Sequence, residues 1–178
     1  MADGEAWIFA YGSLMWDPGF PFLERRPALL RGYHRALCVY SHVWRGTPAR
    51  PGLVLGLDRG GACRGIAFRV AAGAAPAVLD YLERRERVTG VYRRRELPIR
   101  AGAATVRAVC YVVDRAHPQY AGRLAPAEAA RLIRQGMGRG GSNVAYLESA
   151  IAHLDALGLR EGPLHALARL VRGGTGKA

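Results

Sequence analysis

Short apolar runs separated by turn residues fill the first two thirds of the chain. They predict strands over residues 7–11, 53–57, 63–70, 92–100 and 105–113, and a strand or hairpin over 29–43. The Gly- and Pro-rich stretches 17–21 and 46–52 predict loops, because these residues oppose regular structure. Turn residues at 58–61 indicate that 53–57 and 63–70 pair as a hairpin.

The spacing of apolar residues changes to a helical period at four places. The first predicted helix covers residues 74–87, where Val78, Leu79 and Leu82 recur at helical spacing and Gly90 lies just past the end. Three more helices are expected over 126–137, 142–157 and 162–172. Ser142 and Asn143 are candidates to cap the middle one, and residues 173–178 are expected to form a frayed tail.

The order of these elements indicates the fold class. Strands come first and helices last, with one helix between strands, so we expect an α+β fold. Many short strands in 178 residues favour a small, curved or closed mixed β-sheet barrel with flanking helices. No composition shift marks a boundary, so residues 1–178 are expected to form a single domain.

Composition narrows the function classes. No apolar run approaches the roughly 20 residues that span a bilayer, and the first residues are acidic rather than leader-like. We therefore expect no membrane association. The three cysteines, at positions 38, 63 and 110, lie far apart and form no CxxC motif, which indicates reduced thiols in a cytoplasmic protein. The sequence has no cluster of Cys and His residues at ligand spacing, so we expect no metal site.

The net charge of +12 requires its own explanation. Lys177 is the only lysine among 26 basic residues, and arginine binds carboxylates and phosphates well. Anionic ligands are therefore expected, and a basic module that binds nucleic acid or an acidic protein is the non-enzyme alternative. The arginines are spread along the chain without interleaved aromatics, which favours a preference for Arg on solvated surfaces over nucleic-acid binding.

Two segments could carry chemistry. Tyr11, Gly12, Ser13 and Leu14 follow the first predicted strand, where glycine lets the backbone approach a ligand and successive N–H groups can bind an anion. Glu86 ends the first predicted helix. A carboxylate at that end faces the negative pole of the helix, which favours a proton-accepting role, although the adjacent arginines act in the opposite direction.

Together these segments resemble the γ-glutamylcyclotransferase superfamily, through FAYGSLMW at residues 9–16. Further segments in the same order resemble its ChaC branch: RGYHR (31–35), RGTP (45–48), PGLV (51–54), GIAFR (65–69), YL with RE (81–86), YAG (120–122), and SN with YL (142–147). The resemblance covers about residues 7–171. It departs from many relatives at Ala10, where they have Gly, and in a longer link between Glu86 and Tyr92.

The resemblance implies a glutathione-specific γ-glutamylcyclotransferase that releases 5-oxoproline and Cys-Gly without a cofactor or metal. It makes Glu86 the general acid/base, with Glu83 as the rival. It assigns the γ-glutamyl group to Ala10, Tyr11, Gly12, Ser13, Leu14 and Met15. It leaves open whether Arg45 and Tyr120 contact the peptide carboxylates or have a structural role. Cyclisation of other γ-glutamyl amino acids or amines stays open, as does the oligomeric state.

Overall fold

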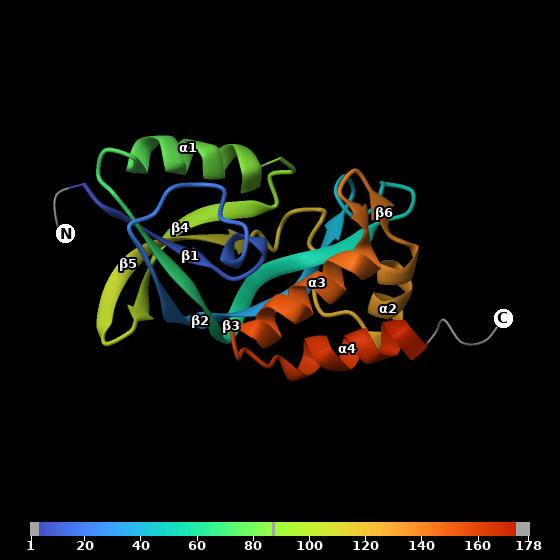
Figure 1. Ribbon diagram of the computed structural model, residues 1–178. Helices are drawn as coiled ribbons and strands as arrows, with labels where there is room; N and C mark the ends of the chain where they lie inside the picture. Colours follow the sequence, from blue (N-terminus) through green and yellow to red (C-terminus); the bar gives the residue numbers. More distant parts are fainter. Residues whose placement is uncertain (1–3, 87, 174–178) are drawn as a thin grey trace. The chain divides into compact units, whose positions relative to one another are not determined.

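Five strands close into a mixed barrel in the order β1-β3-β2-β4-β5 in the computed structural model, which describes residues 4–86 and 88–173 (Figure 1). The strands are β1 (Ala6–Ala10), β2 (Glu24–Ser41), β3 (Gly52–Val70), β4 (Tyr92–Ala101) and β5 (Ala104–Val113). β1 runs antiparallel to β3 and parallel to β5, where Ile8 faces Val109. β4 and β5 form a hairpin that pairs from Tyr92–Val113 to Ala101–Ala104. The predicted α+β barrel is confirmed.

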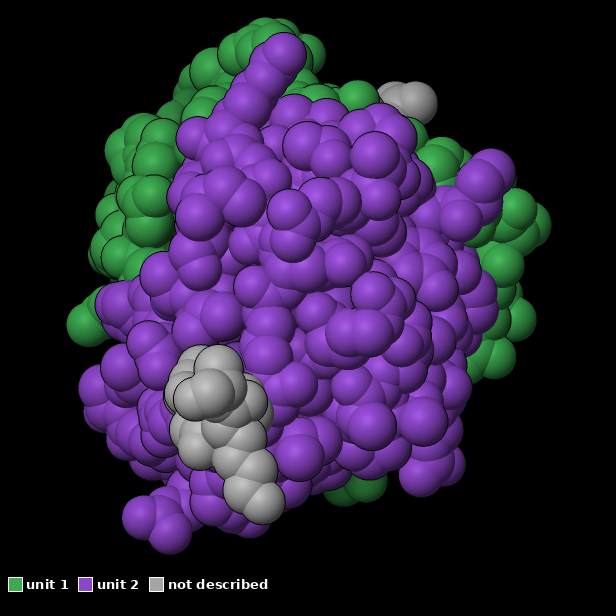
Figure 2. Space-filling model, turned by 90° about the vertical axis from the view of Figure 1, so that its right-hand side faces the viewer, with its two compact units in different colours: residues 1–35, 56–117 green, residues 36–55, 118–178 purple. Residues whose placement is uncertain are grey.

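The chain divides into two compact units, coloured in Figure 2. Unit 1 consists of residues 1–35 and 56–117, and unit 2 of residues 36–55 and 118–178. Unit 1 holds β1, β4, β5, most of β3 and the first part of β2. The expectation of a single domain over 1–178 stays a prediction.

The expected hairpin of 53–57 with 63–70 is wrong. Both segments belong to the single strand β3, and residues 58–61 continue it instead of reversing it. Gly60 and Gly61 have φ values of +101° and +68°, which L side chains rarely adopt. Positive-φ glycines within a strand are typical of bulges, which bend a strand without ending it. The turn residues therefore mark a local distortion of a 19-residue strand.

The four predicted helices are present. They are α1 (Ala75–Glu86), α2 (Pro126–Gln135), α3 (Asn143–Ala156) and α4 (Gly162–Gly173). α2 ends before Met137, which starts a two-stranded ribbon of β6 (Met137–Gly138) and β7 (Gly141–Ser142). Gly173 closes α4, and the rest of the expected frayed tail lies outside the described residues.

The two cap candidates of α3 have different roles. Ser142 is the N-cap, and its hydroxyl accepts hydrogen bonds from Val144 N and Ala145 N. Asn143 is not a cap: its fully buried amide accepts from Leu53 N at 2.6 Å and donates to Leu53 O at 2.8 Å. Because a primary amide can pair with both backbone groups of one residue, Asn143 extends the hydrogen bonding of β3 where a neighbouring strand would otherwise be needed.

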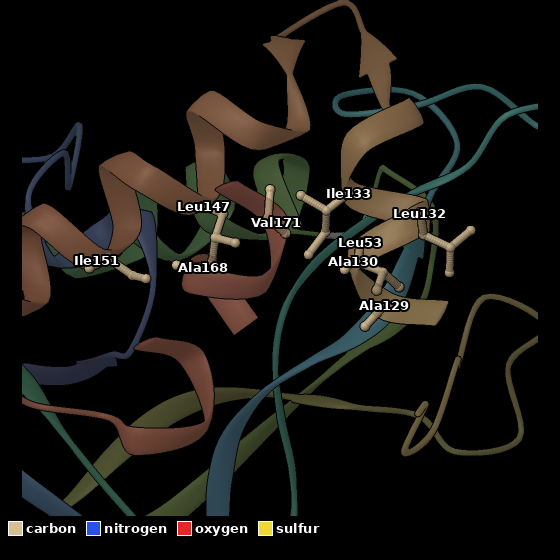
Figure 3. Packing of buried hydrophobic residues seen from close by; sticks show 9 residues of the cluster. All are labelled: Leu53, Ala129, Ala130, Leu132, Ile133, Leu147, Ile151, Ala168 and Val171. Carbon is tan, nitrogen blue, oxygen red and sulfur yellow. The ribbon is translucent and has the colours of Figure 1, made fainter. Parts of the chain in front are cut away.

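The core of unit 2 lies between its helices and the start of β3. Figure 3 shows how apolar side chains from these elements meet. These apolar side chains belong to Leu53, Ala129, Ala130, Leu132, Ile133, Leu147, Ile151, Ala168 and Val171. A polar contact also joins two of the helices: Arg134 of α2 donates to Leu170 O and Val171 O, which are carbonyls near the end of α4.

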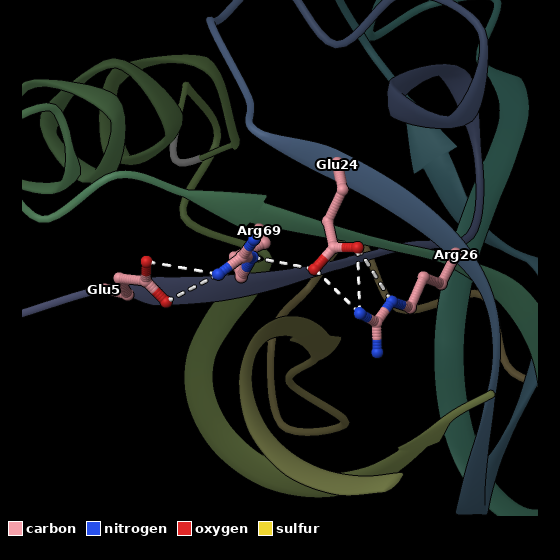
Figure 4. A network of polar contacts seen from close by, with 4 residues as sticks. All are labelled: Glu5, Glu24, Arg26 and Arg69. Carbon is pink, nitrogen blue, oxygen red and sulfur yellow. Dashed lines mark hydrogen bonds and ion pairs between the residues drawn. The ribbon is translucent and has the colours of Figure 1, made fainter. Parts of the chain in front are cut away.

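A surface network of charges connects strands β2 and β3 of unit 1 with Glu5, just before β1 (Figure 4). Arg69 Nη1 donates to the Glu5 carboxylate at 3.3 Å, and Arg26 donates to Glu24 at 2.9 and 3.0 Å. Arg69 Nε lies 2.7 Å from Glu24 Oε1, close enough for an ion pair but without the angle of a hydrogen bond. The four side chains are only partly exposed, at 27–42%. An isolated surface pair stabilises by about 0–1 kcal/mol, and linked charges can contribute more.

Candidate functional site

The turn after β1 is buried except at Ser13. Tyr11, Leu14 and Met15 are at most 8% exposed, whereas Ser13 is half-buried. Residues Ser13–Met15 form the short 3₁₀ helix η1, in which Met15 N donates to Gly12 O at 2.9 Å. The N–H groups of Ser13 and Leu14 stand at the start of this helix, where a helix has no internal acceptor for them. The turn thus offers backbone donors and one hydroxyl.

Arg35 of β2 fixes the backbone of this turn from inside unit 1. Arg35 is 5% exposed, and its guanidinium donates from Nε to Tyr11 O at 2.5 Å and from Nη2 to Arg64 O at 2.6 Å. Gly65 of β3 packs so closely that a Cβ there would overlap the carbonyl oxygen of Ala10. The position of the turn is therefore set by a buried cation and by a close strand contact.

Arg85, near the end of α1, connects the helix to the turn. Its Nη2 donates to Ser13 Oγ at 3.0 Å, and its Nη1 donates to Tyr81 OH at 2.9 Å and to Asp17 O at 3.2 Å. Its Nε lies 3.6 Å from Glu86 Oε1. The structure thus brings Glu86 and Ser13 together around one guanidinium.

Glu86 ends α1 with a side chain that is only 17% exposed. Burial raises the pKa of its carboxyl above the usual 4.5, and the positive charge of Arg85 opposes this shift. A carboxylate with a raised pKa is a better proton acceptor near neutral pH than an exposed one. Glu86 has the properties expected of a general acid/base.

Glu83, the rival carboxylate, has a different environment. It accepts a hydrogen bond from the phenol of Tyr111 on β5 at 3.1 Å. Burial raises the pKa of Tyr111, and the charges of Glu83 and of Glu86 add to the shift, so the phenol keeps its proton and remains a donor to Glu83. Of the two carboxylates, Glu86 is the one that pairs with the arginine that holds Ser13.

The buried carboxyl of Glu86 predicts a stability change of definite sign. A folded-state pKa above the unfolded value means that the folded state binds the proton more tightly, so this contribution is present below the unfolded pKa and is lost as pH rises through the folded pKa. We therefore expect Glu86→Gln to be more stable than the wild type at pH 7. The advantage should disappear below about pH 4. Urea unfolding at several pH values measures it, and a glutamine variant that is less stable at pH 7 would contradict the raised pKa.

The thiols are poor candidates for nucleophiles. Cys38, Cys63 and Cys110 are free and buried. Burial, with a further contribution from Cys63, raises the pKa of Cys110 to about 12. Since the thiolate is the nucleophile, Cys110 stays unreactive at neutral pH.

Among the described residues no three His, Cys, Asp or Glu side chains gather as metal ligands. Nor is any described helix both long and apolar enough to cross a membrane.

Arg45 and Tyr120, the other two predicted site residues, belong to unit 2. Arg45 donates from Nη1 to the carbonyls of Gly140 and Ser142, and its guanidinium lies over the Tyr146 ring at 5.2 Å. Tyr120 forms an isolated bridge with Val39. These contacts give both residues a structural role in unit 2, and their proposed contact with substrate stays a prediction.

Sequence reasoning missed two residues of the site. Arg35 lies within the RGYHR segment, but no sequence feature marks it as buried. Arg85 belongs to the family-like YL with RE segment and is a charge beside Glu86, but nothing in its sequence neighbourhood indicates the bond to Ser13.

Comparison with known proteins supports a common family. The sequence profile of the ChaC-like protein family matches residues 6–173. A glutathione-specific γ-glutamylcyclotransferase of Escherichia coli is 36% identical over 167 residues, which are 93% of this chain and 72% of that protein. The human glutathione-specific γ-glutamylcyclotransferase 1 is 37% identical over 147 residues, covering 79% of this chain and 66% of the human protein.

The fold also has a close counterpart among solved structures. A crystal structure of a yeast γ-glutamyl cyclotransferase specific to glutathione superposes with a TM-score of 0.84. The superposition covers 96% of this chain and 97% of the yeast chain at 21% identity. At that identity the likeness concerns the fold.

Proposed function

Because the chain belongs to the ChaC-like protein family, we propose that it is a γ-glutamylcyclotransferase that acts on glutathione. The relatives from E. coli and human carry this activity in their names. The observation that carries the proposal is the arrangement around Arg85. Its guanidinium donates a hydrogen bond to Ser13 of the turn and pairs with the largely buried Glu86.

The proposed reaction is an intramolecular aminolysis. The α-amine of the γ-glutamyl group attacks its own γ-carbonyl carbon, a new C–N bond closes a five-membered ring, and the bond to the cysteine nitrogen breaks. The products are 5-oxoproline and Cys-Gly. Because the nucleophile is tethered to the electrophile, the enzyme mainly has to hold the folded conformer, which can contribute several kcal/mol.

Glu86 is the proposed general acid/base. The α-amine is protonated in solution, so a base must remove a proton before the amine can attack. The Glu86 carboxylate accepts this proton and returns one to the departing cysteine nitrogen. Proton transfer by one positioned side chain typically contributes ~10²–10⁴-fold in rate. The raised pKa of Glu86 suits this exchange, because a carboxyl that titrates closer to neutral pH can both take and release the proton.

The turn supplies the proposed binding site for the γ-glutamyl group, through Ala10–Met15. Its backbone N–H groups would donate either to the oxyanion that develops on the γ-carbonyl or to the α-carboxylate. Arg45 and Tyr120 are proposed to contact the carboxylates of the peptide. The reaction requires orientation and proton transfer alone, so the proposal includes no cofactor. Three free cysteines fit a reducing compartment, and we propose the cytoplasm.

Product analysis tests the proposal. Purified protein incubated with glutathione is expected to form 5-oxoproline and Cys-Gly in equal amounts, followed by NMR or mass spectrometry. A parallel panel of γ-glutamyl amino acids and γ-glutamyl amines tests the leaving-group preference. Turnover of the panel without turnover of glutathione would move the assignment to other γ-glutamyl compounds. No 5-oxoproline from any substrate would refute the activity.

A further inference from the structure

The Arg85 guanidinium donates three hydrogen bonds within unit 1, whereas an arginine on the surface is usually solvated. Arg85 lies one position before Glu86 and is 25% exposed. Its donors reach three oxygens in the part of unit 1 that forms the turn and α1: Ser13 Oγ, Tyr81 OH and Asp17 O. Such a fork of donors fixes the plane of the guanidinium, because several N–H directions are satisfied at once.

Arg84, the preceding residue, is a natural comparison. Its side chain is 70% exposed and forms an i,i+4 ion pair with Asp80 at 2.8 Å. A surface pair of this kind contributes about 0–1 kcal/mol. The two neighbouring arginines on α1 therefore differ in function: one is a solvated surface charge, and the other joins helix and turn.

The bond from Arg85 determines what the Ser13 hydroxyl can do. A hydroxyl has one hydrogen to donate, and arginine has donors only, so Ser13 Oγ must be the acceptor in this bond. The hydroxyl hydrogen stays available to a further acceptor. Donation by a cation also polarises the hydroxyl and makes it a stronger donor.

We propose that Arg85 is a positioning residue of the active site, which fixes the Ser13 hydroxyl as a donor toward an oxygen of the substrate and holds Glu86 beside it. The inference rests on the proposed function, because it assigns a role within the cyclisation of the γ-glutamyl group. It adds a residue to the site, since Arg85 acts through Ser13 and Glu86 and not by its own contact with the reacting atoms.

The charges around Glu86 support the second part of this role. Arg85 and Glu83 lie on helix α1 with Glu86. On the neighbouring strands, the charge of Glu86 raises the pKa of Tyr111 of β5, and the charge of Arg94 of β4 lowers it. Arg85 is the group that favours the ionised form of Glu86. Removing the Arg85 guanidinium should therefore raise the pKa of Glu86 further. Removing the guanidinium of Arg84 should leave this pKa unchanged.

A double-mutant cycle tests the coupling to Ser13. Arg85→Gln is expected to lower kcat/KM roughly 10- to 100-fold, the range for loss of one hydrogen bond to a charged group. In a Ser13→Ala background the same substitution should have much less effect, because the oriented hydroxyl is already absent. Arg84→Gln is the matched control and should leave kcat/KM near the wild-type value. An undiminished effect of Arg85→Gln in the Ser13→Ala background would overturn the proposal.

A titration of the Glu86 carboxyl by ¹³C NMR separates this inference from the activity itself, because it needs no substrate. Arg85→Gln should raise the pKa of Glu86, and an unchanged titration would overturn the proposal whether or not glutathione is a substrate. A wild-type protein that leaves glutathione intact would refute the proposed function instead.

Arg85→Lys provides a second variant in case Arg85→Gln does not fold. Lysine keeps the charge beside Glu86, but one ammonium cannot reproduce the planar fork of donors. We expect a Glu86 pKa close to the wild-type value together with a reduced kcat/KM. A kcat/KM equal to that of the wild type would overturn the positioning role.

Discussion

Glu86→Gln is expected to lower kcat for 5-oxoproline formation by about 10²–10⁴-fold, the usual contribution of one general acid/base. Glutamine has the shape of glutamate but can neither accept the proton of the attacking amine nor return one to the leaving nitrogen. The variant is expected to be at least as stable as the wild type at pH 7, so a folded protein with a low rate is the expected result. Initial rates with glutathione and a circular dichroism spectrum measure both properties.

Glu83→Gln is the matched control on the same helix. An amide oxygen at this position can still accept the hydrogen bond from Tyr111, so the local structure should persist. We expect a rate of wild-type order in this variant. If Glu83→Gln loses activity and Glu86→Gln keeps it, the two carboxylates have been assigned the wrong way round.

Arg35→Met is expected to destabilise the protein by about 2–5 kcal/mol, because it removes the donors to two carbonyls at a buried position. Methionine occupies similar space but cannot donate to Tyr11 O or Arg64 O. The turn after β1 would lose its internal support, so kcat/KM should fall in the fraction that remains folded. Urea unfolding and initial rates measure the two effects.

The exposed Arg31, on the same strand, provides the comparison for Arg35. Arg31→Met removes a charge of the same sign at a solvated position and should change the free energy of unfolding by less than about 0.5 kcal/mol. Equal stability of Arg35→Met and Arg31→Met would show that the buried guanidinium does not support the turn.

The helices and the strands β4 and β5 could be predicted because their signals are local. Val78 and Leu82 of α1 are both buried, as their helical spacing indicates, and Ser142 caps α3 as its residue type suggests. Glu86 and the turn at residues 10–15 were found because both belong to a family-like pattern. The structure places both in unit 1.

The burial of Arg35 could not be read from alternation along β2. Ala28 and Leu30 are buried at even positions, whereas Arg35 is buried at an odd one. Gly32 lies between them with a φ of +84°, and a distortion of this kind shifts which residues face inward. Similarly, Gly60 and Gly61 bend β3 where the sequence pattern predicted a turn. A glycine preceded by polar residues fits either outcome, and tertiary pairing decides between them.

Contacts between segments distant in sequence explain the remaining failures. Asn143 has the residue type of a cap, but its amide pairs with Leu53, 90 residues away. Arg85 reaches Ser13 across 72 residues. Neither partner could be identified from spacing, because only the fold determines which side chains meet.

The most direct test of the central claim compares two titrations of the wild-type protein. The ¹³C-detected pKa of the Glu86 carboxyl is expected to lie above 4.5, and the acid limb of the pH profile of kcat/KM for glutathione should fall at the same pH. Agreement would identify Glu86 as the base whose ionised form is required. A Glu86 pKa at or below 4.5, or an acid limb at a clearly different pH, would contradict its role.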